Sequence, residues 1–209
     1  MTHTAAHLTE ALLAGDTEAV RGSLTADGTV MITPEYLDGT LTTALAKIGD
    51  SWEGGTVSLS EIFLSAKTAN AATSTLLTEN FRPEQLSICV ATFNDTHVLG
   101  KQIVVDLLHA LGYTLTDLGI CADVDEVVAS AVREDPDILV LSVLMLRSAL
   151  GIRQVRNRLA VEGLFPIIVV GGAPFRIDPD LGLEVGAHYV GRTASDVLKI
   201  MNTVQEELC

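Results

Sequence analysis

A short polar run in the middle of the chain holds the residue types best suited to chemistry. It reads Asp95-Thr96-His97-Val98-Leu99-Gly100-Lys101. One ring nitrogen of His97 can bind a metal ion, and Asp95, two residues earlier, can accept a hydrogen bond from the other. A carboxylate behind a ligating histidine fixes its tautomer and raises its basicity. The run predicts a metal ligand at His97. Two ordinary alternatives are that His97 is a polar surface residue and that Asp95 caps the next helix.

Two further short segments add to this candidate site. Ser142-Val143-Leu144 and Gly171-Gly172 each follow an apolar run that reads as a buried strand. The Ser142 hydroxyl is expected to reach the carboxylate of Asp95, which would give a relay aimed at a ligand. Two glycines remove side chains beside a crevice and let a bulky group approach the backbone. The ordinary alternative is that the two glycines serve a tight turn after the strand, which also favours residues without a side chain.

A serine, a histidine and an aspartate together also suit a hydrolase. The sequence has no Gly-x-Ser-x-Gly elbow, so the α/β-hydrolase interpretation fails. No Gly-x-Gly-x-x-Gly follows the first strand and no Walker loop is present, which excludes a dinucleotide fingerprint and a P-loop.

The elements that must position these residues begin near Arg82-Pro83-Glu84, where short apolar segments start to alternate with amphipathic ones. Five segments read as strands: Leu86–Thr92, Thr114–Leu118, Ile138–Ser142, Ile167–Val170 and Ala187–Val190. The others read as helices: Leu99–Leu111, Val124–Arg133, Arg147–Ala160, Pro179–Val185 and Ala194 to about Glu207. Such alternation predicts a parallel α/β sheet, and short right-handed connections favour the flavodoxin-like, doubly wound order 2-1-3-4-5.

In a sheet of this kind, ligands bind beyond the carboxyl ends of the strands, near the point where the strand order reverses. The first, third and fourth predicted strands are followed by the Asp95–Lys101 run, by Ser142-Val143-Leu144 and by Gly171-Gly172. We therefore expect all three segments to meet at one edge of the sheet.

Residues 1–82 read as helical throughout. The first helix places Leu8 and Leu12 on one face, and Asp16 is a cap for the second. Thr33-Pro34-Glu35 is a start signal for a third helix to about Trp52, ended by Gly54-Gly55. Ser58 or Ser60 opens a fourth helix to about Asn80. The prediction is a four-helix domain over residues 1–82, before a Rossmann-like domain over residues 83–209.

The bulk composition narrows the class of protein. The chain has 209 residues, 48% of them hydrophobic, and a formal charge of −14. Such a charge repels nucleic-acid phosphate and anionic lipid, so neither is an expected partner. Three widely spaced cysteines, Cys89, Cys121 and Cys209, argue against a disulfide framework or a zinc site. With no signal peptide or spanning segment recognised, a reduced cytoplasm is the expected compartment.

The three segments match the cobalamin-binding signature of methionine synthase and of corrinoid proteins from methyltransferase systems. The family pattern is Asp-x-His-x-x-Gly, then Ser-x-Leu, then Gly-Gly. Forty-one residues separate Gly100 from Ser142, and 26 separate Leu144 from Gly171. Both spacings resemble those of the family, and the helical half is similar to the family's cap domain.

The resemblance implies a base-off corrinoid, in which a protein histidine replaces the nucleotide base under the cobalt. The ligand role falls to His97, and the hydrogen-bonding roles fall to Asp95 and Ser142. The cofactor-binding residues that the resemblance implies are Asp95, Thr96, His97, Val98, Leu99, Gly100, Ser142, Leu144, Gly171 and Gly172. Of these, Ser142, Leu144, Gly171 and Gly172 would line the slot for the nucleotide tail.

In function, the resemblance implies the corrinoid subunit of a cobalamin-dependent methyltransferase system. Such a protein carries a methyl group between partner methyltransferases, and a corrinoid reactivase is a further partner. The helical domain would cover the methyl face of the cofactor. Three alternatives share the motifs: a small subunit of an adenosylcobalamin mutase, a cobalamin sensor, and a storage or delivery protein.

Overall fold

The structure, a computed structural model, describes residues 5–26, 29–30, 37–74, 76–77 and 86–208. The chain divides into two compact units. The helical unit comprises Met1–Glu84, Asp106–Tyr113 and Ser195–Cys209, and the sheet unit comprises Gln85–Val105 and Thr114–Ala194. No helix in the described residues is long and apolar enough to span a bilayer.

The sheet unit is built on parallel strands. Within its described residues there are five: β3 (Ile88–Phe93), β4 (Leu115–Cys121), β5 (Ile138–Ser142), β6 (Ile167–Gly171) and β7 (Tyr189–Gly191). Their order is β4-β3-β5-β6-β7. Counted from one to five this is the order 2-1-3-4-5, so the predicted fold class is confirmed. The order reverses between β3 and β5, which makes their carboxyl ends the expected ligand edge.

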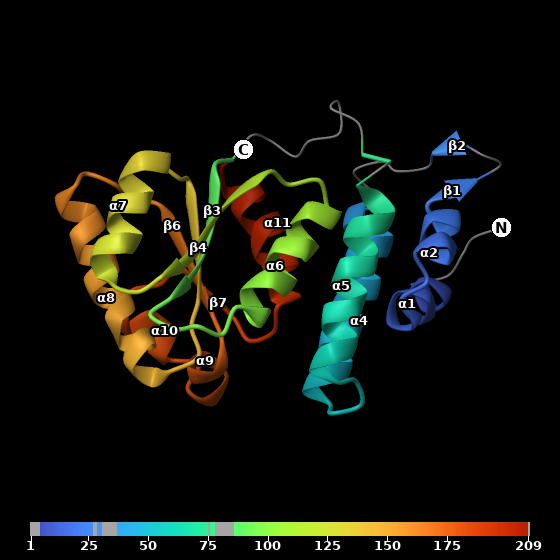
Figure 1. The fold of residues 1–209 in the computed structure, drawn as a ribbon, viewed down its shortest axis with the longest axis horizontal. Helices are drawn as coiled ribbons and strands as arrows, with labels where there is room; N and C mark the ends of the chain where they lie inside the picture. Colours follow the sequence, from blue (N-terminus) through green and yellow to red (C-terminus); the bar gives the residue numbers. More distant parts are fainter. Residues whose placement is uncertain (1–4, 27–28, 31–36, 75, 78–85, 209) are drawn as a thin grey trace. The chain divides into compact units, whose positions relative to one another are not determined.

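Alternate residues of each strand face opposite sides of the sheet. One side packs against α7 (Val124–Glu134) and α8 (Leu146–Val161), which lie together on one side in Figure 1. Its buried core takes Cys89, Ala91 and Phe93 from β3, with Leu139 and Leu141 from β5 and Ile168 and Val170 from β6. The even-numbered residues of β3 and β5 therefore face the other side.

The helix α6 (Leu99–Ala110) begins two residues after the candidate histidine, His97. Lys101 in its first turn is buried, and its ammonium donates to both carboxylate oxygens of Asp117 on β4. Asp117 also accepts the backbone N–H of Gly119, at 2.8 Å, where the β3–β4 register shifts and φ is +76°. Glycine adopts this φ without the strain that a Cβ would add. The ion pair and the bulge together hold the start of α6 against β4.

Some predicted boundaries in the sheet unit were wrong. β4 continues to Cys121, past the predicted end at Leu118, because the bulge at Gly119 lets the pairing resume. A short helix, α9 (Ala173–Ile177), was missed, although Pro174 in its first turn is a start signal. α10 (Leu181–Glu184) is shorter than predicted.

The helical unit confirms the first two predicted helices, α1 (Ala5–Ala14) and α2 (Thr17–Ser23). Leu8 and Leu12 on α1 are buried, as their spacing indicates. The Asp16 side chain caps α2 by accepting the backbone N–H of Ala19 at 2.9 Å. The unit also holds the last helix of the chain, α11 (Asp196–Leu208).

The prediction of helix throughout residues 1–82 was wrong after α2. Two short antiparallel strands, β1 (Thr25–Ala26) and β2 (Thr29–Val30), pair there. The missed signal is the Asp27-Gly28 dipeptide, which is typical of tight hairpins. The predicted start at Thr33-Pro34-Glu35 lies outside the described residues. A π-helical turn, η1 (Leu37–Leu41), leads into α4 (Thr42–Glu53), which ends at Gly54-Gly55 as predicted.

The helix α5 (Leu59–Thr73) starts at the predicted cap but ends early. Ser58 accepts the N–H of Glu61 at 3.2 Å, and the Glu61 carboxylate accepts the N–H of Ser58 at 2.7 Å. These hydrogen bonds lower the pKa of Glu61. The predicted continuation of this helix past Thr73 was wrong for Ser74, Leu76 and Leu77, and the rest of the predicted stretch to Asn80 lies outside the described residues. The Thr73 and Ser74 hydroxyls bond to backbone carbonyls of the last turn, a competition with helix that such side chains commonly provide.

This reciprocal cap gives a stability prediction. Replacing Ser58 by alanine removes one side-chain acceptor from the first turn of α5. We expect Ser58→Ala to lower the free energy of unfolding by about 1 kcal/mol, measured by urea denaturation. Ser60→Ala, in the same exposed turn but outside the cap, is the matched control and should leave it nearly unchanged. Equal losses in both variants would contradict a specific cap.

Candidate functional site

The chain leaves β3 through a turn that begins at Asn94. This residue has φ of +49°, a left-handed conformation that asparagine tolerates better than most residues. Its N–H donates to the carbonyl of Cys121 at 2.7 Å, and its carbonyl accepts the hydroxyl of Ser148 at 2.9 Å. Asn94 and Ser148 were not predicted as site residues. Together they anchor the start of the candidate loop to β4 and α8.

The structure brings Asp95 and His97 together as predicted. The Asp95 Oδ1 atom lies 2.5 Å from the His97 Nδ1 atom. The same oxygen accepts the backbone N–H groups of Thr96 and His97, at 2.7 and 3.0 Å. The Asp95 side chain is 5% exposed and the His97 side chain 68% exposed. A buried carboxylate therefore holds Nδ1, and the ring with its Nε2 atom lies at the surface.

The surroundings of Asp95 keep it charged. Burial acts to raise the pKa of Asp95, but hydrogen bonds from the His97 ring and from the backbone N–H groups of His97 and Thr96 outweigh it. The pKa is therefore lowered. The second oxygen, Oδ2, is buried without a hydrogen-bond partner. An ionised carboxylate beside Nδ1 favours the tautomer in which Nδ1 carries the proton and Nε2 can act as a ligand.

Ser142 does not complete the predicted relay in this structure. It is the last residue of β5, next to Thr92 in the strand register, and no hydrogen bond joins its hydroxyl to Asp95. Its hydroxyl lies beside the first turn of α6, since a Cβ on Gly100 would lie 3.3 Å from the Ser142 Oγ atom. The absence of a side chain at Gly100 thus lets the first turn of α6 approach β5.

The two glycines after β6 have different roles. Gly172 has φ of +127°, and a Cβ there would lie 1.7 Å from the carbonyl oxygen of Val143, so the backbone itself requires glycine. Gly171 is a regular strand residue whose Cβ would lie 3.3 Å from the carbonyl oxygen of Gly191. Only Gly171 leaves side-chain space on the face of the sheet.

An exposed apolar rim follows the same strand ends. Its large side chains are between 38% and 58% exposed, and they come from the loop after β3 and the loop after β5: Val98, Leu99, Leu144, Met145 and Leu146. Exposed apolar groups that gather at one place commonly mark a ligand or partner surface. Thr96 lies exposed in the same loop.

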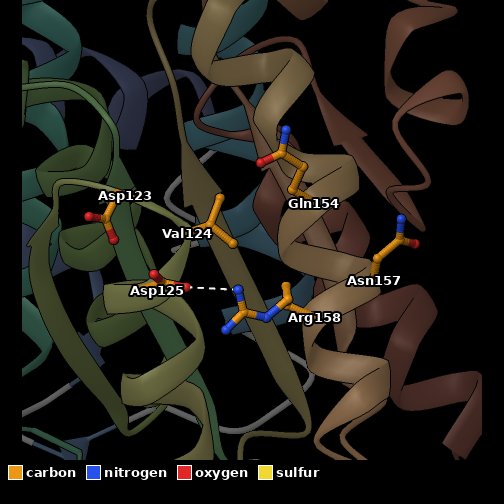
Figure 2. A pocket seen from close by; sticks show the side chains of 6 residues that line it. All are labelled: Asp123, Val124, Asp125, Gln154, Asn157 and Arg158. Carbon is orange, nitrogen blue, oxygen red and sulfur yellow. Dashed lines mark ion pairs between the residues drawn. The ribbon is translucent and has the colours of Figure 1, made fainter.

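A polar hollow lies elsewhere on the sheet unit (Figure 2). Its lining comes from the start of α7 and the second half of α8: Asp123, Val124, Asp125, Gln154, Asn157 and Arg158. The Arg158–Asp125 ion pair, at 2.9 Å, is largely exposed and contributes little stability. None of the predicted site residues lines this hollow, so it is distinct from the candidate site.

The buried cysteines lie in the core cluster between the sheet and α7 and α8. Burial raises the pKa of Cys89 to about 11, and burial likewise raises the pKa of Cys121. Both thiols are protonated at neutral pH, and a thiol must be ionised to serve as a strong metal ligand. His97 remains the metal-ligand candidate of this edge.

Comparison with known families identifies this arrangement. The profile of the B12 binding domain matches residues 87–200, more than half of the chain, and a second B12 binding domain profile matches residues 4–77. The chain belongs to the B12-binding family. Its cofactor is a corrinoid, as the motif resemblance implied.

Relatives of this B12-binding protein are corrinoid proteins from Methanosarcina. Monomethylamine corrinoid protein 1 of Methanosarcina acetivorans is 31% identical over 73% of this chain and 74% of its own length. Trimethylamine corrinoid protein 1 of Methanosarcina mazei is 26% identical over 78% of this chain and 79% of its own length.

Solved structures share the fold. A cobalamin-binding protein from Desulfitobacterium hafniense superposes with a TM-score of 0.74 at 23% identity, covering 95% of this chain and 97% of its own. A chain of a methanol:cobalamin methyltransferase complex from Methanosarcina barkeri superposes with a TM-score of 0.65 at 22% identity. The match covers 96% of this chain and 78% of that chain.

The residues of this B12-binding protein fit a corrinoid on their own chemistry. A surface imidazole offers one nitrogen, and a buried carboxylate whose Oδ2 atom lacks a partner supports it. The apolar rim suits the edge of a large macrocycle, and the absent side chain at Gly171 leaves room beside it. A macrocycle fills most of the coordination sphere of its metal, so a single protein ligand is enough.

Filling the space at Gly171 gives a prediction. We expect Gly171→Leu to place a side chain against the Gly191 carbonyl and to weaken cobalamin binding about tenfold through steric conflict. Retention after gel filtration and equilibrium titration measure the change. The control is Gly22→Leu on α2, an exposed glycine with nothing within 4 Å of its Cβ position. If a Gly171→Leu variant with the wild-type circular dichroism spectrum retained cobalamin as the wild type does, a binding slot at Gly171 would be contradicted.

Proposed function

We propose that this protein is a methyl carrier that binds its corrinoid base-off, with His97 as the lower cobalt ligand, and serves partner methyltransferases. Relatives of this chain are named as corrinoid proteins of trimethylamine, monomethylamine and methanol systems. A structural neighbour is a complex of a methanol:cobalamin methyltransferase. These names support a partner that acts on a methylamine or on methanol.

The observation that carries the proposal is the Asp95–His97 contact. A carboxylate with 5% exposure fixes Nδ1 of a ring that is itself 68% exposed. A surface histidine that binds no metal gains little from a buried carboxylate whose pKa is lowered. A histidine that binds a metal needs this carboxylate, because it fixes the tautomer and the direction of the ring. Three hydrogen bonds to one Asp95 oxygen make the orientation rigid.

When bound, the corrinoid supplies a metal centre that accepts and releases the methyl group. The chain's own residues hold and shield it. Asp95 keeps the proton on Nδ1 of His97, which directs Nε2 to the cofactor. Val98, Leu99 and Leu144 belong to the apolar rim, which excludes water from the edge of the ring.

The proposed cofactor-binding set keeps all the motif residues: Asp95, Thr96, His97, Val98, Leu99, Gly100, Ser142, Leu144, Gly171 and Gly172. We assign the cap role to residues 1–82 and the cofactor role to residues 83–209. A corrinoid reactivase as a second partner and the cytoplasm as the compartment complete the proposal.

The ligand role predicts a spectral change in one variant. We expect His97→Ala loaded with cobalamin to lose the absorption of a nitrogen-ligated cobalt and to show the base-off form. Absorption spectroscopy of wild type and variant at equal loading measures this. His7→Ala, at an exposed position of α1, is the matched control. A visible spectrum that is the same in His97→Ala and wild type would reject His97 as the ligand.

The carrier role predicts dependence on two added components. We expect the spectrum of the reduced, cobalamin-loaded protein to change when methanol or a methylamine is supplied together with its corrinoid methyltransferase. Neither component alone should have this effect. Wild-type protein that binds cobalamin but shows no change with any of these pairs would favour a storage protein over a methyl carrier.

A further inference from the structure

The neighbouring helices α7 and α8 carry opposite charges. With its two cap residues, at 123 and 135, α7 holds five carboxylates and one arginine, a net charge of −4. Residues 146–161 of α8 hold four arginines and no acidic residue, a net charge of +4. In a chain with a formal charge of −14, such a basic helix is an exception. An acidic and a basic surface therefore lie next to each other on one side of the sheet.

These charges do not neutralise each other within one chain. Across residues 123–161, all of which are described, one ion pair joins α7 to α8. It is Arg158–Asp125, whose side chains are 52% and 74% exposed. Arg153 donates instead to the backbone carbonyl of Glu184, at 2.6 Å. All four arginines of α8 are exposed, so most of the charge of this helix faces solvent.

The outer side of α8 combines apolar and amide side chains between its arginines. The buried residues of the helix face the core cluster. On the opposite side, Leu150, Gln154, Asn157 and Val161 follow one another at steps of four, three and four residues, the spacing of one helix face. Leu150 is 52% exposed and Val161 is 79% exposed. Uncharged side chains with a charged margin are typical of the centre of a protein interface.

The helix α7 offers a low surface beside this ridge. Its exposed side runs through Asp125, Ala129 and Val132, of which alanine is small and Val132 is 49% exposed. The polar hollow lies on the same surface, because residues of both helices line it (Figure 2). A ridge on one helix pair can pack into the groove of another. We call this surface the α7–α8 face and define it by Asp125, Val132, Leu150, Asn157, Arg158 and Val161.

A second copy of this chain is the partner whose charge fits the α7–α8 face. An interface with two-fold symmetry must be complementary to itself. A two-fold axis that runs along the groove between the helices places α7 of each copy over α8 of the other. An acidic helix then meets a basic helix on both sides of the axis. A partner with one sign of charge would be repelled by one of the two helices.

We propose that the protein forms a two-fold dimer through the α7–α8 face, with α7 of each copy on α8 of its partner. The helices are about 16 and 24 Å long and about 10 Å wide, so two copies cover roughly 800 Å² of each other's surface in projection. Such an area is at the low end for a specific interface, and the net charge of −14 on each copy opposes association. The dimer is therefore reversible. It uses no residue of the proposed cofactor-binding set, so it stands independently of the proposed function.

Sedimentation velocity of the full-length chain over micromolar to millimolar concentrations measures the association. We expect a monomer–dimer equilibrium with a Kd in the micromolar range. Val161→Glu places a carboxylate on the ridge, opposite the acidic α7 of the other copy, and should raise this Kd about tenfold or more. Leu183→Glu is the matched control, because Leu183 is 74% exposed on α10, outside the α7–α8 face. The control adds the same charge and should leave the Kd within about twofold of wild type.

Two charge reversals test which helix meets which. Arg158→Glu makes α8 of one copy repel α7 of another, and Asp125→Lys makes α7 of one copy repel α8 of another. The Arg158–Asp125 pair is exposed and contributes little to stability, so both variants should keep the fold. We expect each variant alone to raise the Kd about tenfold.

An equal mixture of the two charge-reversed variants should form dimers about as well as wild type. In the mixed dimer one contact keeps the original charges and the other has both charges reversed, so each contact is attractive. If α7 met α7 and α8 met α8, neither reversal alone would weaken the dimer. Loss in each variant with recovery in the mixture is therefore specific to α7 over α8.

Three outcomes would overturn the proposal. The first is a wild-type chain that stays monomeric up to millimolar concentration. A monomer that binds its corrinoid methyltransferase less tightly after Val161→Glu would assign the α7–α8 face to that enzyme instead. The second is a dimer that Val161→Glu and Leu183→Glu affect equally, because the copies would then meet elsewhere. The third is a mixture of the charge-reversed variants that stays as monomeric as each variant alone.

Discussion

The proposed cofactor edge of this protein depends on one hydrogen bond, between the carboxylate of Asp95 and Nδ1 of His97. The bond joins a buried group to an exposed one, at 2.5 Å. The carboxylate stays ionised because backbone N–H groups and the histidine ring offset its burial. Without that charge, neither the tautomer nor the direction of the ring would be fixed, and His97 would lose the orientation that its proposed role as a cobalt ligand requires.

At this edge the sheet fixes the positions of short connections whose backbone conformation is tightly constrained. Asn94 turns the chain out of β3 with a left-handed φ, and Gly172 turns it out of β6 where a Cβ would collide with Val143. The buried ion pair of Lys101 with Asp117 holds the first turn of α6. Each connection places a short polar or apolar segment beyond the strand ends, which is where doubly wound sheets bind ligands.

Much of this could be predicted from the sequence because the signals are local. The strand Ile138–Ser142 was predicted to the residue, and the order 2-1-3-4-5 follows from alternating strands and helices with short connections. The sequence did not predict the hairpin of β1 and β2 or the early end of α5, because short hairpin and hydroxyl signals are weak beside a surrounding helical pattern. The Ser142–Asp95 contact was expected from proximity, but the structure places Ser142 beside Gly100.

The sequence by itself determined which residue types are available and how far apart they stand: an acid two residues before a histidine, and glycines after a buried strand. Only the tertiary structure decided that Thr92, Ser142, Gly171 and Gly191 form one row, and that Gly171 and Gly172 have different tasks. The reason is physical. Register between strands is set by long-range pairing and by the packing of both faces, and a single strand's sequence does not contain its neighbour's alignment.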